Sequence, residues 1–238
     1  MESRFCEYEE GGKSFEAYLA YEPNELKSKP AVLIAHAWAG RGQFEIDMAN
    51  TLASWGYIGF AADVYGKGVL GTSTEENSKL MQPFMDDRSL INKRLNASIE
   101  ALKAQEMVSN DKIAAIGFCF GGLCVLDLAR SCHPDIKGAV SLHGLFIPPS
   151  ISQTNNIEAK ILALHGHEDP MVPPDAVVAL EQELTQRNAD WQMHTFGKTL
   201  HGFTNPAAND LNLGVKYNEL NSKRAFNLTK SFLKELLN

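Results

Sequence analysis

The chain of 238 residues is 44% hydrophobic and 21% charged, which is typical of a globular protein with a substantial core. Its net charge of −7 argues against nucleic acid or an anionic membrane as a partner. No apolar run reaches the ~18 residues of a membrane span, and the polar N-terminus is unlike a signal peptide. The four cysteines lack metal-site spacing, so we expect no metal and reduced thiols in a cytoplasmic protein.

The N-terminal part of the chain alternates between polar and apolar residues. This pattern predicts two strands, Arg4 to Glu10 and Lys13 to Tyr21, joined in a hairpin at Gly11-Gly12. A polar connection, Pro23 to Pro30, then leads to the first fully apolar strand, Ala31 to Ala35. Continuous apolar strands are typical of parallel sheets covered on both faces.

The rest of the chain alternates apolar strands with helices, which predicts an α/β fold: a mostly parallel, doubly covered sheet with an antiparallel N-terminal hairpin. We expect one domain over residues 1–238, a turn at Ser109-Asn110-Asp111, and a closing helix with Leu220, Phe226, Phe232 and Leu236 on one side. The further predicted strands are Tyr57 to Ala62, Lys112 to Ile116, Ile136 to Leu142, Lys160 to Leu164 and Trp191 to Phe196. The predicted helices are Phe44 to Trp55, Glu76 to Met107 with an interruption around Pro83, Leu123 to Ala129, Pro174 to Arg187 and Tyr217 to Leu237.

The segment Gly117-Phe118-Cys119-Phe120-Gly121 has the form G-x-C-x-G between a predicted strand and a predicted helix. It matches the nucleophile elbow G-x-S-x-G with sulfur in place of oxygen. Glycines on either side of the nucleophile would relieve the clashes of such a sharp turn, and the helix N-terminus would favour a thiolate or an oxyanion. A buried cysteine that packs as a small hydrophobe is the alternative, but the strand and helix around it favour a catalytic Cys119.

Two further strand ends carry residues that could complete a triad. Asp169 follows a predicted strand, where its carboxylate could fix the tautomer of a histidine; it could instead cap a turn before Pro170, and Glu168 is a competing acid. His201, flanked by Gly202, follows the last predicted strand. The order Cys119, Asp169, His201 is that of the α/β-hydrolase fold. Three other histidines lie at or just past strand ends and could line the same site: His36, His143 and His165.

Gly117-x-Cys119-x-Gly121-Gly122, His165-Gly-x-x-Asp169-x-x-Val172-Pro173 and His201-Gly-Phe203 together resemble the dienelactone hydrolase family. The resemblance implies an α/β-hydrolase fold and a Cys119–Asp169–His201 triad that cleaves esters or lactones through a thioester, with no cofactor. It also implies an oxyanion hole made by the backbone N–H groups of Trp38 and Phe120.

The chain departs from the founding members of that family at charged positions. Their glutamate after the first apolar strand is replaced by Ala37, and two arginines that hold a carboxylate are replaced by Asn205 and by a residue near Asn77. We therefore expect a neutral or more apolar ester, although Arg41 or Arg88 could replace the missing charges. The residues expected to line the pocket or contact substrate are His36, Trp38, Phe120, His143, Phe146, Phe203, Asn205 and Arg88.

Two other functions compete with hydrolysis: a non-catalytic binding protein on the hydrolase fold, and a redox role for Cys119 with Cys124 as the resolving thiol. A regular helix after the elbow would turn Cys124 away from Cys119, which argues against the redox role. We expect a small-molecule ester or lactone as substrate, no nucleic-acid or membrane partner, and a monomer or homodimer.

Overall fold

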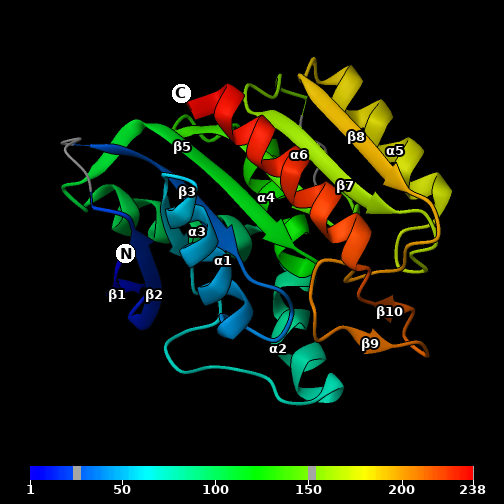
Figure 1. Cartoon of the computed structure of the whole chain (residues 1–238), viewed down its shortest axis with the longest axis horizontal. Coiled ribbons are helices and arrows are strands. Elements are labelled where there is room, and N and C mark those ends of the chain that lie inside the picture. Colours follow the sequence, from blue (N-terminus) through cyan, green and yellow to red (C-terminus); the bar gives the residue numbers. More distant parts are fainter. Residues whose placement is uncertain (24–27, 150–153, 238) are drawn as a thin grey trace.

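The computed structural model describes residues 1–23, 28–149 and 154–237, so residues 24–27 of the predicted connection Pro23 to Pro30 lie outside it. An eight-stranded sheet in the order β1-β2-β4-β3-β5-β6-β7-β8 crosses the molecule (Figure 1). Pairing is antiparallel from β1 to β4 and parallel from β4 to β8, as predicted. The strands are β1 (Glu2–Glu10), β2 (Lys13–Tyr21), β3 (Lys29–Ala35), β4 (Ile58–Ala61), β5 (Val108–Phe118), β6 (Ile136–Leu142), β7 (Lys160–Gly166) and β8 (Trp191–Phe196).

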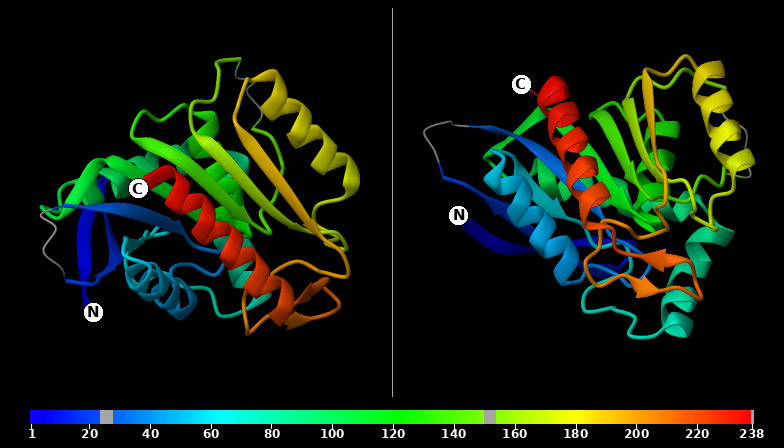
Figure 2. Two further views of the ribbon diagram at one scale, coloured as in Figure 1. Left: turned by 45° about the horizontal axis from the view of Figure 1, so that its top comes forward. Right: turned by 45° about the vertical axis from the view of Figure 1, so that its right-hand side comes forward.

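Helices cover both faces of the sheet, which confirms the predicted architecture (Figure 2). Helices α1 (Gln43–Ser54) and α6 (Glu219–Leu237) pack on one face, and α3 (Ser89–Lys103), α4 (Phe120–Arg130) and α5 (Pro174–Gln186) pack on the other. Helix α2 (Thr74–Asp86) joins the second group through Phe84. A small hairpin of β9 (Asn209–Asp210) and β10 (Val215–Lys216) precedes α6 and was not predicted.

The central strands feed both cores because successive side chains point to opposite faces. In β3, Leu33 packs in the core beneath α3 and α4, whereas Val32 and Ile34 pack in the core beneath α1 and α6. All three side chains are fully buried. The continuous apolar run of this strand therefore reflects burial on both faces.

The N-terminal hairpin turns at Gly11 and Gly12, whose φ angles are +57° and +74°. A two-residue hairpin turn of type I′ needs positive φ at both positions, and glycine adopts it without steric cost. The predicted β1–β2 hairpin is confirmed, with Glu10 opposite Lys13 in its register.

Three local predictions were wrong. Ser109-Asn110-Asp111 lies within β5, because this strand begins at Val108, which pairs with Lys29 ahead of an irregularity in the register. The interruption predicted around Pro83 comes later, at Asp87 and Arg88 between α2 and α3, and α2 continues through Pro83, with Asp87 N–H donating to Pro83 O at 3.0 Å. Leu220 is 59% exposed, since the buried side of α6 is formed by Asn221, Ala225, Phe232 and Leu233, among others.

The sheet has a topological switch between β3 and β5. From β3 the chain moves to β4 on one side and later to β5 on the other, so the loops at the carboxyl ends of these strands diverge. In open α/β sheets such a switch point is where ligands bind.

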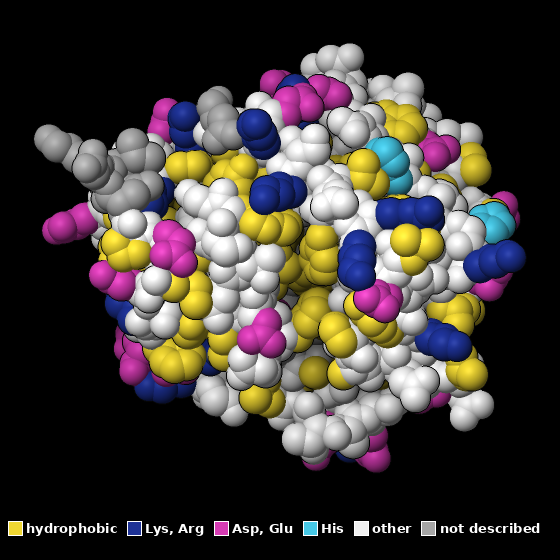
Figure 3. Space-filling view, in the orientation of Figure 1, with side chains coloured by type: hydrophobic (Ala, Val, Ile, Leu, Met, Phe, Trp, Pro, Cys, Tyr) yellow, Lys and Arg dark blue, Asp and Glu magenta, His cyan; other side chains and the backbone are white. Residues whose placement is uncertain are grey.

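Acidic and basic side chains are interspersed on the face seen in Figure 3. Among the described residues, no helix is both long and apolar enough to span a membrane.

Candidate active site

Cys119 lies at the junction between β5 and α4 in a strained conformation. Its φ and ψ are 54° and −117°, a positive-φ region that is unfavourable for a residue with a side chain. The flanking glycines make this turn possible, because a Cβ at Gly117 would lie 2.0 Å from Gly121 O, and a Cβ at Gly121 would lie 2.1 Å from Ala35 O. The sharp turn leaves the Cys119 side chain at the edge of a cavity.

Asp169 and His201 meet across two loops, as their order in the sequence predicts. Nδ1 of His201 and Oδ2 of Asp169 are 2.7 Å apart, and both residues are 3% exposed. Asp169 Oδ1 accepts the Met171 N–H at 2.8 Å, which fixes the carboxylate. This arrangement places the hydrogen on Nδ1 and leaves Nε2 of His201 to face the site.

The ring of His201 lies close to the Cys119 side chain. Its Nε2 is buried and has no hydrogen-bond partner among the described residues. Burial alone would lower the pKa of His201, but negative charge on Cys119 and the hydrogen bond with Asp169 outweigh it and raise this pKa to about 10. The raised pKa of His201 follows in part from the close approach of its ring to the Cys119 side chain, although these two side chains form no hydrogen bond.

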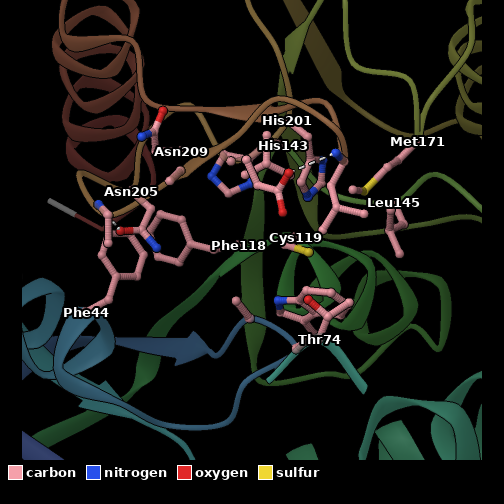
Figure 4. Close-up of a pocket in the computed structure, with 18 of the residues that line it drawn as sticks. Phe44, Thr74, Phe118, Cys119, His143, Leu145, Met171, His201, Asn205 and Asn209 are labelled. Carbon is pink, nitrogen blue, oxygen red and sulfur yellow. Dashed lines mark hydrogen bonds between the residues drawn. The ribbon is translucent and has the colours of Figure 1, made fainter. Parts of the chain in front are cut away.

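A cavity of about 390 Å³ opens over Cys119 and His201. Figure 4 shows both side chains there with His143, Asn205 and Met171. Among the described lining residues there is no lysine or arginine, and Asp210 carries the one carboxylate. The remaining lining is largely apolar: Ala37, Trp38, Phe44, Met81, Phe118, Leu145, Met171, Ala207, Ala208, Leu213 and Val215.

Of the two residues predicted for the oxyanion hole, Phe120 follows Cys119 directly and Trp38 lines the same cavity as Cys119. Phe120 begins α4, so its backbone N–H has no acceptor within the helix. Its ring points into the core, where it packs with His36, Tyr65 and Phe84. Trp38 lines the cavity in the loop after β3, and Tyr65 Oη donates to its carbonyl oxygen at 3.0 Å, which holds this loop.

Of the predicted substrate contacts, the structure brings His143 and Asn205 to the cavity. The ring of Phe146 instead packs on His165, and that of Phe203 on His143 and Phe196. Neither phenylalanine lines the cavity.

His36 and Arg88 are held elsewhere by hydrogen bonds. The Val64 N–H donates to His36 Nε2 at 3.1 Å, so the hydrogen of this ring is on Nδ1 and bonds to Ala37 O at 2.7 Å. Arg88 donates to both Asp127 oxygens, at 2.7 and 2.9 Å. Arg41 is paired with Glu16 at 3.0 Å. The suggested replacements for the missing cations are therefore engaged by acidic partners outside the cavity.

Several lining residues were not predicted from the sequence. Thr74 and Met81 come from α2, and residues 207–215 come from the β9–β10 region, neither of which has a motif that marks it as part of a site. Leu145 and Met171 follow strand ends, which was the one available signal, because loops at these ends gather around the site. The four described cysteines are free, and no cluster of His, Cys, Asp and Glu among the described residues is placed to hold a metal.

One known protein family matches almost the whole chain. The model of the dienelactone hydrolase family matches residues 15–237. The chain belongs to the dienelactone hydrolase family. Membership makes this protein an ester or lactone hydrolase, and it confirms the resemblance that the three motifs indicated.

Relatives of this dienelactone hydrolase family member cover most of its length. A putative carboxymethylenebutenolidase of Aquifex aeolicus (strain VF5) is 26% identical over 243 residues, 98% of this chain and 99% of the relative. An uncharacterised protein of Caenorhabditis elegans is 36% identical over 156 residues, 63% of this chain and 96% of that protein. A dienelactone hydrolase-like promiscuous phosphotriesterase from metagenomic libraries superposes with a TM-score of 0.94 at 28% identity, covering 100% of this chain and 99% of the other. The α/β-hydrolase fold is thereby confirmed.

Proposed function

We propose that this protein hydrolyses uncharged esters or lactones through a thioester formed on Cys119. The observation that carries the proposal is the 2.7 Å contact between His201 and Asp169, with Nε2 of His201 left facing Cys119 beside a cavity. A nucleophile, a base and a group that orients the base are the parts that covalent acyl transfer requires.

In the proposed acylation step, the Cys119 thiolate attacks the substrate carbonyl carbon while His201 carries a hydrogen on both ring nitrogens. The raised pKa of His201 favours this imidazolium at neutral pH. Backbone N–H groups of Trp38 and Phe120 would stabilise the oxyanion, an effect worth about 3–4 kcal/mol for each donor. His201 then donates its Nε2 proton to the departing alkoxide, and the C–O bond breaks to leave a thioester.

In the proposed deacylation step, His201 accepts a proton from water as the water oxygen attacks the thioester carbon. Collapse of the second tetrahedral intermediate breaks the C–S bond, releases the acid and restores Cys119 and the His201 imidazolium. Asp169 holds Nδ1 of the ring throughout. The proposed steps use only protein groups and water, so they need no metal or organic cofactor.

The charges around the cavity support an uncharged substrate. Asn205 lines the cavity where the family's founding members carry an arginine, and Asp210 adds negative charge to the wall. The His201 imidazolium in this wall is already paired with Cys119 and Asp169, so a substrate carboxylate would lose hydration here without gaining a free cationic partner, which costs free energy. We therefore propose neutral aryl or alkyl esters and neutral lactones as the substrate class, and not the anionic dienelactone.

The test is to compare the wild type with Cys119→Ala and Cys119→Ser on p-nitrophenyl butyrate and on dienelactone. We expect Cys119→Ala to lower kcat/KM by about ten thousandfold, because a triad without its nucleophile retains little activity. Iodoacetamide should abolish wild-type activity at one equivalent per chain. Activity that survives Cys119→Ala refutes the mechanism, and a preference for dienelactone refutes the substrate class.

Two competing functions are less well supported. A binding protein on this fold would not need the 2.7 Å contact between His201 and Asp169 beside the cavity. Cys124 is fully buried, and burial raises its pKa well above the ordinary value, which opposes a resolving role. We also propose a single domain over residues 1–238, a monomer or homodimer, and a reducing compartment such as the cytoplasm.

A further inference from the structure

The dipeptide Leu142–His143 at the end of β6 contacts all three segments of the proposed triad. The Cys119 N–H donates to Leu142 O at 3.1 Å, and the His143 N–H donates to Leu164 O at 2.8 Å, in the strand that leads to Asp169. The His143 side chain reaches the third segment: its Nε2 shares a hydrogen bond of 2.8 Å with Oγ1 of Thr204, shortly after His201.

The hydrogen bond between His143 and Thr204 is shielded from water. His143 is 2% exposed and Thr204 is 1% exposed. Burial lowers the pKa of His143 well below its ordinary value, and positive charge on His201 lowers it further, so the His143 ring stays neutral. The two imidazole rings pack edge to face with centroids 5.3 Å apart (Figure 4).

The backbone of His143 adopts an unfavourable conformation to make these contacts. Its φ is +39°, a region that glycine occupies at little cost and that histidine seldom occupies. Strained residues of this kind persist where the surrounding structure fixes them, and they are found most often at functional sites.

We propose that His143 is a positioning residue for His201 and acts through Thr204, an inference that rests on the proposed function. The main chain of His201 is otherwise held by Gly214 and Lys216, with both hydrogen bonds at 3.0 Å. Those partners lie in the β9–β10 hairpin, where Lys216 is exposed and Gly214 is buried. The His143–Thr204 hydrogen bond instead ties the loop of His201 to the sheet, in direct register with Cys119, and so sets the distance between base and nucleophile.

The experiment compares Thr204→Val, which keeps the shape and removes the hydroxyl, with Thr204→Ser, which keeps the hydroxyl. For p-nitrophenyl butyrate we expect Thr204→Val to lower kcat about tenfold and to change KM less than twofold, since the lost contact orients His201 and does not bind substrate. Thr204→Ser should restore kcat to within about threefold of wild type. Thr229→Val is the matched control, because Thr229 is a buried threonine on α6 whose Oγ1 donates to Ala225 O.

The pH profile separates positioning from a general loss of stability. The basic limb of kcat/KM should lie near pH 10 in the wild type and move to lower pH in Thr204→Val, because a displaced His201 loses part of the contact with Cys119 and Asp169 that raises its pKa. Thr229→Val should leave this limb in place. A Thr204→Val enzyme with kcat within twofold of wild type and an unmoved basic limb overturns the proposal.

A measurement on the wild-type protein keeps the proposal testable if Thr204→Val does not fold. Nitrogen-15 shifts of the His143 ring should report a neutral imidazole down to pH 5, because a ring buried against Thr204 and beside the His201 charge has a pKa well below its ordinary value. A ring that titrates near pH 6.5 overturns the positioning role. This outcome differs from failure of the proposed function, which Cys119→Ala alone decides.

Discussion

The protonation of His201 gives the sharpest test of the site. A rise of its pKa from 6.5 to about 10 corresponds to a preference for the imidazolium of about 5 kcal/mol. Burial opposes this rise, so the charge on Cys119 and the contact with Asp169 must supply it. Cys119→Ala removes the largest of the favourable contributions, and we expect it to lower the pKa of His201 to below about 8.

The assay is NMR of protein with isotope-labelled histidine, with the carbon and nitrogen shifts of the His201 ring followed from pH 5 to 11. The wild-type ring should remain an imidazolium to about pH 9, and the alanine variant should lose its hydrogen at lower pH. Asp169→Asn is a second variant with an independent effect, because it removes the carboxylate at Nδ1. A wild-type His201 that titrates near 6.5, or a pKa that Cys119→Ala leaves unchanged, would refute the ion-pair reasoning.

Two further substitutions test the electrostatics of the molecule. Glu183→Gln should lower the free energy of unfolding by about 2 kcal/mol in urea titrations, because Arg130 is 2% exposed and donates to both Glu183 oxygens. Glu181→Gln is the matched control. Equal losses of unfolding free energy in the two variants would contradict this account. Asn205→Arg should raise kcat/KM for dienelactone relative to p-nitrophenyl butyrate about fivefold by adding a cation to the cavity wall. An unchanged ratio would mean that charge does not set the substrate preference.

The three residues of the proposed triad could be singled out because each lies in a recognisable local sequence. Gly117 and Gly121 have no room for a Cβ, so the elbow leaves a trace in the sequence that marks Cys119. Asp169 follows the apolar strand β7 and His201 comes shortly after β8, and parallel strands bring such ends to one edge of the sheet. The alternation of strands and helices predicted the sheet for the same reason, since burial on both faces requires continuous apolar runs.

The wall of the cavity could not be predicted in the same way. His36 follows a strand as His143 does, yet the Val64 N–H binds its Nε2 and holds the ring in the core. Arg88 is held by Asp127, far along the sequence. Partners of this kind depend on tertiary contacts that leave no periodic pattern, and the same holds for Met171 and Leu213, which lie in loops.

The β9–β10 hairpin contributes to the cavity wall through Leu213 and Val215, and it also holds the main chain of His201, which bridges to Val215. Selection for a wider cavity in this segment would therefore disturb the base as well as the entrance. Directed evolution of new specificity should meet a trade-off here, with substrate range and turnover changing together. Within the part of the chain that the structure describes, Thr74 and Met81 on α2 make no hydrogen bond or β-bridge to His201, so libraries at these positions should alter selectivity while sparing rate.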